Sequence, residues 1–380
     1  MARLSLFLLF VVLTLAWWRL RTNRAQIRPG LGLETWPVVS DGLHNSNTDL
    51  VFWRDHFWLV HAASPWHLGS PDCRLRLWRS ADARRFEPVT ELRVPGEDIR
   101  DPKFAVIGGR LLLYAFPNRG RRALPYTTVY SASEDGSSWS GFEPIEPPGW
   151  LLWRPKSRDG IDWYVPAYWH EHGRSRLFSS HDGVHWSPVS DIHEGDANDE
   201  TDFEFLPDGR ILVTARLEGS ADSPLGSADA CTLLATSFPP YHAWTERRST
   251  VTRLDGPALF AFGGVVLAVG RFQPARRGWL TQSGSMLARK RTSLFLVEDD
   301  RLVRLTDFPS AGDTSYAGVV VRNGSLYASY YTSDIRHDYP WLLGMLLPSE
   351  IRIAKLDLSA VMELVREIRS GGESGMRPAL

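Results

Sequence analysis

The feature that most limits the possible folds of this chain is a seven-residue phrase that recurs along it. Residues 133–139 and 180–186 both read Ser-x-Asp-Gly-x-x-Trp, and residues 80–86 repeat the pattern with Ala83 in place of glycine. The copies begin 53 and 47 residues apart. The aspartate can accept hydrogen bonds from turn amides and the glycine can adopt a positive φ, so each copy predicts a hairpin turn. Copies at this period predict an array of similar supersecondary units.

Short alternating apolar segments closed by turn residues fill the chain from position 50 to position 357. The chain contains 31 Gly, 25 Pro and 16 Trp, which suits a large core interrupted by many turns. Helical periodicity is confined to residues 360–368, near the end. Strands this short and numerous predict an all-β sandwich, barrel or propeller.

A second series of polar clusters runs in step with the first and selects the propeller. Its intervals are 52, 53, 46, 55 and 58 residues, counted at Asp49, Asp101, Arg154, Glu200, Asp255 and Asp313. Six clusters predict a six-bladed β-propeller, in which the innermost strand of each blade starts near the central axis. The clusters would then converge on one axial pocket. The alternative is that loops are simply polar and that this phase fits by chance.

We expect four regions along the chain. Residues 1–24 form a signal anchor or signal peptide, 25–41 a linker or ring-closing strand, 42–358 the propeller, and 359–380 a short helix with a disordered tail. The apolar run at 4–18 would span about 22 Å as a helix, less than the roughly 30 Å of a membrane core. No small-x-small cleavage site follows it, which favours an uncleaved anchor. We therefore expect a membrane-anchored, extracytoplasmic protein, although the arginines after the run leave the side uncertain.

Composition excludes several classes of protein. The net charge is −1, from 43 basic and 44 acidic residues, so there is no electrostatic footprint for nucleic acid. Cys73 and Cys231 are the only cysteines and have no partner at metal-ligand spacing, although one bridge between them remains open. The histidines are scattered along the chain, so we expect no metal and no cofactor.

One predicted hairpin, at residues 198–216, carries an unusual set of charges. Glu200 lies at its start and Arg216 at the end of the return strand, with a Pro-Asp-Gly turn between them. A glutamate and an arginine at neighbouring strand ends can face one cavity and bind an anionic or hydroxylated ligand. The alternative is a solvated acidic turn and a surface arginine.

The seven-residue phrase is an Asp box, and together with a six-blade period it resembles the sialidase superfamily over roughly residues 42–358. The resemblance implies that Tyr316 is the nucleophile, Glu200 its base, and Arg216 and Arg271 ligands of the substrate. Asp313 precedes the tyrosine in the same motif and is a further candidate substrate ligand. The Phe-Arg-Ile-Pro motif of that family is missing, and Arg100 is the candidate to replace its arginine.

An acid/base carboxylate is also required, and Asp49 and Asp101 are the candidates. The tripeptide Arg-Asp-Pro at 100–102 is similar to one in five-bladed fructosidase-like and arabinanase-like glycosidases, where the aspartate stabilises the transition state. Only four lysines occur beside 39 arginines, and the retention of Lys103 and Lys156 favours a functional role for both.

Lys103, Arg154 and Lys156 are therefore candidate substrate ligands beside the aromatic residues at 150–153. Structural alternatives exist: Tyr316 could be a packed core tyrosine, Asp101 with Lys103 an ion pair, and the basic residues partners in cation-π packing. Insertions at 274–291 and 335–348 could overhang the pocket. The sequence predicts a glycoside hydrolase acting on an anionic or hydroxyl-rich glycan, with a non-catalytic propeller that binds glycan or protein as the alternative.

Overall fold

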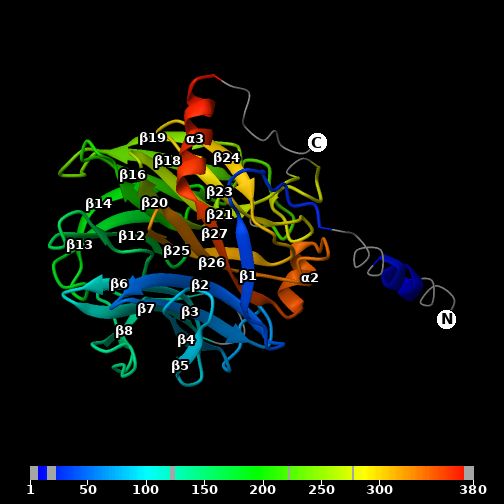
Figure 1. Ribbon diagram of the computed structural model, residues 1–380, viewed down its shortest axis with the longest axis horizontal. Coiled ribbons are helices and arrows are strands. Elements are labelled where there is room, and N and C mark those ends of the chain that lie inside the picture. The colour runs from blue at the N-terminus through cyan, green and yellow to red at the C-terminus, as the bar shows by residue number, and fades with distance from the viewer. Residues whose placement is uncertain (1–6, 15–22, 120–124, 221–222, 276–277, 372–380) are drawn as a thin grey trace.

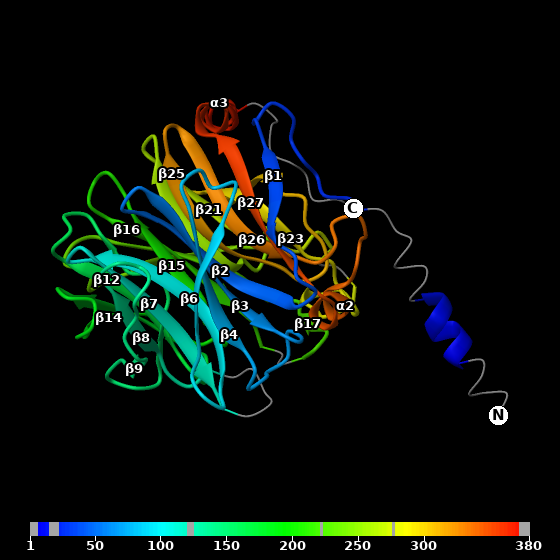
Figure 2. The same ribbon diagram turned by 60° about the horizontal axis from the view of Figure 1, so that its bottom comes forward.

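The computed structural model describes residues 7–14, 23–119, 125–220, 223–275 and 278–371. Within them, six antiparallel sheets surround a common centre, as Figures 1 and 2 show from two directions. In each sheet the strand that comes first along the chain, or β25 in the last one, lies innermost, and its neighbours follow outwards. The predicted all-β six-bladed propeller is therefore confirmed.

The blades are formed as follows, each from its innermost strand outwards. Blades 1 to 3 consist of β2 (His44–Trp53), β3 (His56–Ser64), β4 (Arg74–Ser80) and β5 (Glu87–Leu92); β6 (Asp98–Ile107), β7 (Arg110–Asn118), β8 (Val129–Ser133) and β9 (Glu143–Pro144); and β10 (Trp150–Leu152) with β11 (Lys156–Ser157), β12 (Trp163–Trp169), β13 (Arg174–Ser180) and β14 (Ser187–Glu194). Blades 4 to 6 consist of β15 (Thr201–Phe205), β16 (Ile211–Leu217), β18 (Cys231–Ser237) and β19 (Thr245–Ser249); β20 (Asp255–Phe262), β21 (Val265–Phe272), β23 (Arg291–Val297) and β24 (Leu302–Asp307); and β25 (Thr314–Arg322), β26 (Ser325–Thr332), β27 (Glu350–Asp357) and β1 (Glu34–Val39). The remaining strands, β17 (Gly226–Ser227) and β22 (Ser283–Gly284), pair with each other.

The ring is closed by the strand nearest the N-terminus. β1 pairs antiparallel with β27 and is the outermost strand of the sixth blade, whose other strands come from the end of the chain. Its register runs from the pair Glu34 and Lys355 to the pair Val39 and Ile351. β1 is thus held in the last blade by backbone hydrogen bonds, and the chain then continues into β2 of the first blade, which closes the ring.

The recurring seven-residue phrase forms self-contained turns. In residues 133–139 the Asp135 carboxylate accepts the backbone N–H groups of Ser137 and Ser138, each at 2.7 Å. Trp139 Nε1 donates to the Gly136 carbonyl at 2.9 Å. A side chain on Gly136, at φ +78°, would collide with the Trp58 ring of blade 1. The turn therefore also fixes the packing between neighbouring blades.

The degenerate copy at residues 80–86 is completed from another blade. Its last position is Phe86, which has no ring N–H, and Trp36 of β1 donates Nε1 to the Ala83 carbonyl at 3.0 Å instead. Residues 157–163 form a further turn with the same aspartate bonds, in which Asp159 accepts from Ile161 at 2.8 Å, but Trp163 Nε1 has no hydrogen-bond partner. That copy lies between β11 and β12, whereas the other copies follow the third strand of their blades. Because it falls outside the regular spacing of the other copies, the spacing did not predict it.

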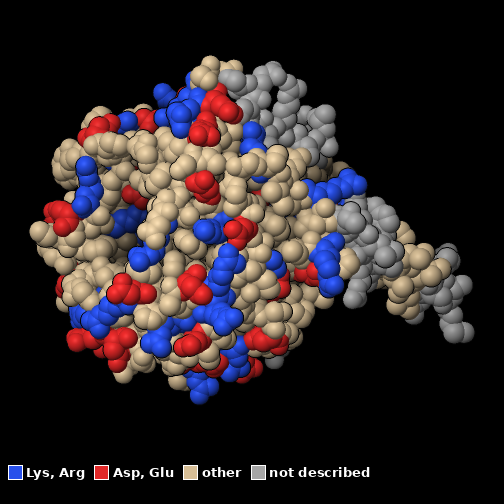
Figure 3. All heavy atoms as spheres, viewed as in Figure 1, with Lys and Arg blue, Asp and Glu red and all other residues tan. Residues whose placement is uncertain are grey.

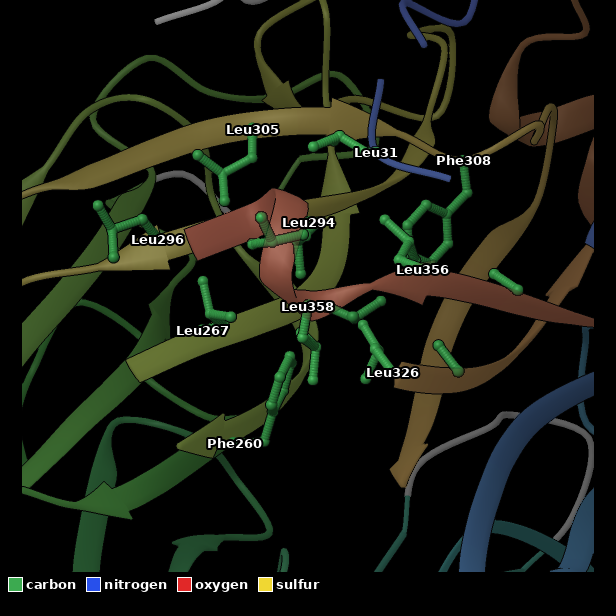
Figure 4. Packing of buried hydrophobic residues seen from close by; sticks show 14 of the residues in the cluster. Leu31, Phe260, Leu267, Leu294, Leu296, Leu305, Phe308, Leu326, Leu356 and Leu358 are labelled. Atoms are coloured by element: carbon green, nitrogen blue, oxygen red, sulfur yellow. The ribbon is translucent and has the colours of Figure 1, made fainter. Parts of the chain in front are cut away.

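A helix after the last strand covers the contact between blades 5 and 6. α3 (Leu358–Arg369) begins two residues before the predicted helical segment and ends one after it. Its N-cap, Asp357, accepts the Ser359 N–H at 2.8 Å, which satisfies a free amide of the first turn. Figure 4 shows Leu358 packed among leucines of both blades, with Leu31 closing the cluster. A short helix, α2 (Trp341–Leu346), lies in the insertion before β27.

Residues 7–14 are helical with exposed apolar side chains, and Figures 1 and 2 draw them outside the propeller. None of the helices in the described ranges is long and apolar enough to cross a membrane. The flanking residues of the predicted anchor, 1–6 and 15–22, and the tail at 372–380 lie outside the described residues. The two cysteines are buried and form no disulfide.

Basic and acidic side chains are interspersed over the face drawn in Figure 3. This pattern agrees with the nearly balanced charge of the sequence. The face shows no large area of one sign that would attract a polyanion.

Candidate active site

Backbone bulges build the axial site. The register shifts near the start of the inner strands β2, β6, β20 and β25. At these bulges the residues Asn47, Asp101, Gly256 and Tyr316 have positive φ angles of 47°, 49°, 58° and 47°. A bulge redirects a side chain and bends its strand, and bulges are frequent beside active sites. In four of the six blades, a bulge therefore redirects a residue of the polar cluster, whereas the inner strands of blades 3 and 4 have no register shift.

Glu200 and Tyr316 form the centre of this site. The Tyr316 hydroxyl donates a hydrogen bond to Glu200 Oε1, and the Gly256 N–H donates to Oε2 at 2.6 Å. A Cβ on Gly256 would lie 2.7 Å from the Tyr316 ring, so only glycine leaves room for the tyrosine. Gly256 belongs to one of the polar clusters along the chain, but its position in the sequence does not reveal this role.

Burial and neighbouring charges tune both groups. Burial, with help from the carboxylates of Asp199, Asp255 and Asp101, raises the pKa of Glu200 to about 7 against the opposing effect of Arg216. Burial and the Glu200 charge raise the pKa of Tyr316 well above its usual value. The hydrogen bond thus joins a neutral phenol to a carboxyl group that titrates near neutral pH, as general base catalysis requires.

The arginines around the pair are each held by a carboxylate. Arg216 donates Nε to Asp199 at 2.6 Å and a second hydrogen bond to the same carboxylate, while its Nη1 lies 3.0 Å from Glu200 Oε1. Arg253 binds Asp255 through two hydrogen bonds of 2.7 and 3.0 Å. These bidentate contacts fix the guanidinium groups and neutralise them within the site.

Arg271 is positioned from both sides of its guanidinium plane. Its Nη2 donates to Asp313 at 3.1 Å and to the Tyr331 hydroxyl at 2.8 Å. Its carbon Cζ lies 5.0 Å from the centre of the Tyr316 ring and 4.9 Å from that of Trp341. The cation therefore stabilises negative charge on the tyrosine through the ring face.

Asp313 contacts several residues of the site and holds them in place. Its Oδ1 accepts hydrogen bonds from Tyr331 at 2.9 Å and Trp341 at 2.7 Å, in addition to Arg271. Its Oδ2 lies 3.1 Å from His44 Nε2 and 2.7 Å from His67 Nδ1. Although burial alone would raise it, these partners hold the pKa of Asp313 well below its usual value. Asp313 is fully enclosed, so it positions other groups of the site and is not exposed to a substrate, contrary to its predicted substrate-binding role.

Asp101 faces the pair from blade 2. It is half-buried, and Asn47 Nδ2 donates to its Oδ1 at 2.5 Å. Its charge acts on Glu200, on Tyr316 and on Lys103. Lys103 is buried with Nζ 4.3 Å from the centre of the Trp153 ring, and burial lowers the pKa of this lysine to about 8.

Arg100 has a different partner. Its Nε donates to Asp98 at 2.5 Å, and its buried Nη2 has no hydrogen-bond acceptor. Arg100 thus lies next to Asp101 along the chain but is anchored to the start of its own strand.

Three further candidates make contacts between blades. Asp49 accepts the Phe104 N–H at 2.6 Å and a hydrogen bond from Arg154, which also donates to the Ala317 carbonyl at 2.5 Å. Lys156 donates to the Leu259 carbonyl at 2.9 Å. These contacts cross from one blade to another, and they favour a structural role for Asp49, Arg154 and Lys156. Asp101 is then the better candidate for the acid/base residue.

A cleft of about 860 Å³ opens next to Arg253, and neither Glu200 nor Tyr316 is among the residues that line it. Arg253, Glu218 and His172 line it, and Glu218 connects it to Arg216 at 3.5 Å. Despite burial, the arginines and His172 lower the pKa of Glu218 to about 2. Glu218 lies two residues after Arg216 and one residue beyond the end of β16, and this close spacing could have revealed it from the sequence.

Both predicted insertions form part of this cleft. Met286 from one and Trp341 from the other line it. The two insertions also touch each other, because the Trp341 N–H donates to the Ala288 carbonyl at 3.0 Å and the Leu342 N–H to the Met286 carbonyl at 2.8 Å. The rim of the cleft is thus a joint product of blades 5 and 6.

Fold and site together define a closed six-bladed β-propeller with a polar axial site, and comparisons with solved structures narrow this class. The chain has a sialidase-like propeller fold. It is similar to Trypanosoma rangeli sialidase in complex with sialic acid, with a TM-score of 0.61, 12% identity and coverage of 91% of this chain. It is also similar to the NanB sialidase from Streptococcus pneumoniae, with a TM-score of 0.58, 10% identity and coverage of 90% of this chain and 71% of that one.

The present chain spans 62% of the length of the Trypanosoma protein. A protein of unknown function from Dyadobacter fermentans is matched over its whole length and over 87% of this chain, with a TM-score of 0.60 and 15% identity. No protein-family model and no curated protein matches the sequence. Identities this low establish the fold alone.

Proposed function

We propose that the protein is a glycoside hydrolase in which Tyr316 is the nucleophile and Glu200 its general base. The observation that carries the proposal is the buried hydrogen bond from the Tyr316 hydroxyl to Glu200 Oε1. A nucleophile in contact with a base that is itself fixed by a third group is the usual sign of covalent catalysis. Here the Gly256 N–H and Arg216 fix the base.

In the first step, the Tyr316 oxygen forms a bond to the anomeric carbon while Glu200 accepts the phenolic proton. The bond between that carbon and the leaving oxygen breaks, and Asp101 gives the leaving oxygen its proton. In the second step, Asp101 takes a proton from water and the water oxygen bonds to the anomeric carbon. The bond from that carbon to the Tyr316 oxygen breaks, and Glu200 returns its proton to Tyr316. Two displacements at one carbon give net retention of configuration.

The surrounding cations support the first step. Negative charge that develops on the Tyr316 oxygen meets Arg216, and the ring face meets Arg271 at 5.0 Å. In a site from which water is largely excluded, such fixed charges stabilise a transition state more strongly than they would in water.

The substrate class follows from how the arginines are paired. Arg216, Arg253 and Arg271 already bind Asp199, Asp255 and Asp313, so a sugar carboxylate would have to compete with protein carboxylates. We therefore favour a hydroxyl-rich glycan over a strongly anionic one. The Trypanosoma sialidase has been solved with sialic acid and as a covalent intermediate with 2,3-difluorosialic acid, which supports covalent sugar chemistry on this fold.

A non-catalytic propeller that binds glycan through the same cleft is the second candidate. This candidate is favoured by the restricted access to the pair, since Glu200 is only 5% exposed and Tyr316 only 8%. In that case the hydrogen bond between them would only hold blades 4 and 6 together.

A panel of chromogenic glycosides with neutral and acidic sugars tests the proposal. Wild type, Glu200→Gln and Tyr316→Phe are compared, with Tyr327→Phe as the control from the neighbouring strand of the same blade. The proposal predicts turnover by wild type and the control, and loss of turnover with retained glycan binding in the other two. Binding without turnover of any glycoside by wild type would favour the second candidate.

A membrane-attached, extracytoplasmic location is a further part of the proposal, supported by the apolar run near the N-terminus. Expression of the chain with and without residues 1–24, followed by separation of membrane and soluble fractions, tests it. The proposal predicts that only the longer chain is found with the membrane.

A further inference from the structure

Two imidazoles and a carboxylate meet where the first and last blades join. His44 begins β2, His67 lies between β3 and β4, and Asp313 directly precedes β25. Asp313 Oδ2 lies 3.1 Å from His44 Nε2 and 2.7 Å from His67 Nδ1, and all three atoms are within 4.8 Å of one another. This cluster is separate from the Glu200 and Tyr316 pair, and the proposed reaction does not use the histidines.

In neutral His44, one ring nitrogen has an acceptor next to it but no proton to donate. His44 Nδ1 lies 2.9 Å from the Leu347 carbonyl oxygen, which can only accept, so Nδ1 carries the proton. In the neutral ring the lone pair of Nε2 then faces Asp313 Oδ2, which also only accepts. A cation between the two atoms removes this conflict. A histidine that donates one ring N–H to a backbone carbonyl and offers the other nitrogen is the usual arrangement in metal sites.

His67 reaches the same oxygen without a regular hydrogen bond. Its Nδ1 is buried and lies 2.7 Å from Asp313 Oδ2, yet the contact does not have hydrogen-bond geometry. Two ligands of one tetrahedral ion with bonds of about 2.0 Å lie roughly 3.3 Å apart, so His67 moves outwards by about half an ångström when the ion binds. The backbone N–H of His67 donates to the Met345 carbonyl at 2.9 Å, which fixes its loop.

The Asp313 carboxylate is oriented by hydrogen bonds to one of its two oxygens. Oδ1 accepts hydrogen bonds from Arg271, Tyr331 and Trp341, so Oδ2 is left to the histidines. Outer partners of this kind orient a ligand and are a regular part of metal sites.

We propose that His44 Nε2, His67 Nδ1 and Asp313 Oδ2 bind a divalent transition-metal ion, with Zn²⁺ as the best fit. Two imidazoles and one carboxylate suit Zn²⁺ in tetrahedral coordination, with water in the fourth position. The ion joins blade 1 to blade 6 at the closure of the ring and fixes the residues that precede Tyr316. Its site is independent of whether Tyr316 is catalytic.

Metal content and thermal stability of the full chain test this proposal. The protein is stripped with a chelator, incubated with one equivalent of Zn²⁺, desalted and analysed for bound metal, alongside His44→Gln and His67→Gln. His181→Gln is the control, because His181 is exposed and lies outside the cluster. We expect about one Zn²⁺ per chain and a rise in Tm on its addition for wild type and the control, with both effects lost in each cluster variant. Bound Co²⁺ should give the strong visible absorption of tetrahedral coordination.

His67 is partly exposed, so His67→Gln is expected to fold even if the buried His44 variant does not. Circular dichroism of the stripped proteins checks this point. A wild type that retains no stoichiometric Zn²⁺, or a His67→Gln variant that binds as much as wild type, overturns the proposal. A Tm that is insensitive to Zn²⁺ but rises with acidification would assign the cation to a proton on His44 and overturns it equally.

Discussion

Tyr316 and Glu200 are 116 positions apart in the sequence, yet the hydroxyl of one donates a hydrogen bond to the carboxyl group of the other. Tyr316 lies on β25 of blade 6 and Glu200 directly precedes β15 of blade 4, while β20 of blade 5 supplies the Gly256 N–H to the same carboxyl group. The pair therefore exists only when the ring is closed. Closure depends on β1, which completes the last blade.

The space left by Gly256 is predicted to be essential for activity. In Gly256→Ala the added Cβ would press on the Tyr316 ring at 2.7 Å and displace the hydroxyl from Glu200. A displacement near 1 Å at a reacting group can reduce the rate about 100-fold. We expect such a fall in kcat, measured on the best glycoside.

Gly264→Ala is the matched control for this experiment. Gly264 has a similar positive φ of 79°, but an added Cβ meets no atom within 4 Å. Backbone strain alone should therefore affect both variants equally. An unchanged kcat in Gly256→Ala, or an equal fall in both variants, contradicts the predicted role of Gly256.

The pH dependence of the reaction should report on Glu200. Its pKa is raised to about 7, and only the carboxylate can accept the Tyr316 proton. Below about pH 7 the fraction of carboxylate falls tenfold for each unit, so kcat/KM should decline with the same slope. The profile is measured with wild type between pH 4 and about 9. A flat profile across pH 5 to about 8 would exclude Glu200 as the base with this pKa.

Asp101 is predicted to act on the leaving group. In Asp101→Asn the proton for the leaving oxygen is missing, so kcat for unactivated glycosides should fall by about 10²–10⁴-fold, the usual contribution of general acid catalysis. Glycosides with a nitrophenol leaving group need little protonation and should lose much less in the first step. Equal losses for both types of substrate would assign Asp101 another role. Asp49→Asn provides the comparison, since Asp49 binds the Phe104 N–H and Arg154 instead.

The turn at residues 180–186 is predicted to stabilise the contact between blades 2 and 3. Gly183 has φ +77°, and an added Cβ would lie 2.5 Å from Ile107 and 2.8 Å from the Tyr114 hydroxyl, which donates to the Gly183 carbonyl at 2.7 Å. Gly183→Ala should lower the free energy of unfolding by about 1–3 kcal/mol beyond the strain of the backbone. Gly173→Ala, at φ +83° with open space around it, measures that strain alone. Denaturant unfolding that gives equal losses for the two variants would contradict this prediction.

The propeller could be predicted from the sequence because each blade repeats one local pattern. Turn phrases and polar clusters recur at a blade-sized period, and period is a property that a sequence displays directly. The positions of Glu200, Tyr316, Arg216 and Arg271 followed from resemblance to a family, and the fold brings all four together.

The partners of the charged residues could not be predicted, because they depend on contacts between blades. Asp49 resembles a catalytic carboxylate in the sequence, but its oxygens meet the Phe104 amide of the next blade and Arg154 of the one after. The pairing of Arg216 with Asp199 and of Arg271 with Asp313 is equally invisible. The bulges that turn Asp101 and Tyr316 towards the axis change the register of a strand, and periodicity does not reveal such a shift.

The central claim is that Tyr316 forms a covalent bond to the sugar, and trapping the intermediate tests it most directly. Wild type is incubated with a fluorinated analogue of the best glycoside that slows breakdown of the intermediate, then digested and analysed by peptide mass spectrometry. The account predicts one added glycosyl group per chain, on the peptide that contains Tyr316 and absent from Tyr316→Phe. An adduct on Glu200 or Asp101, or turnover with no adduct at all, would contradict it.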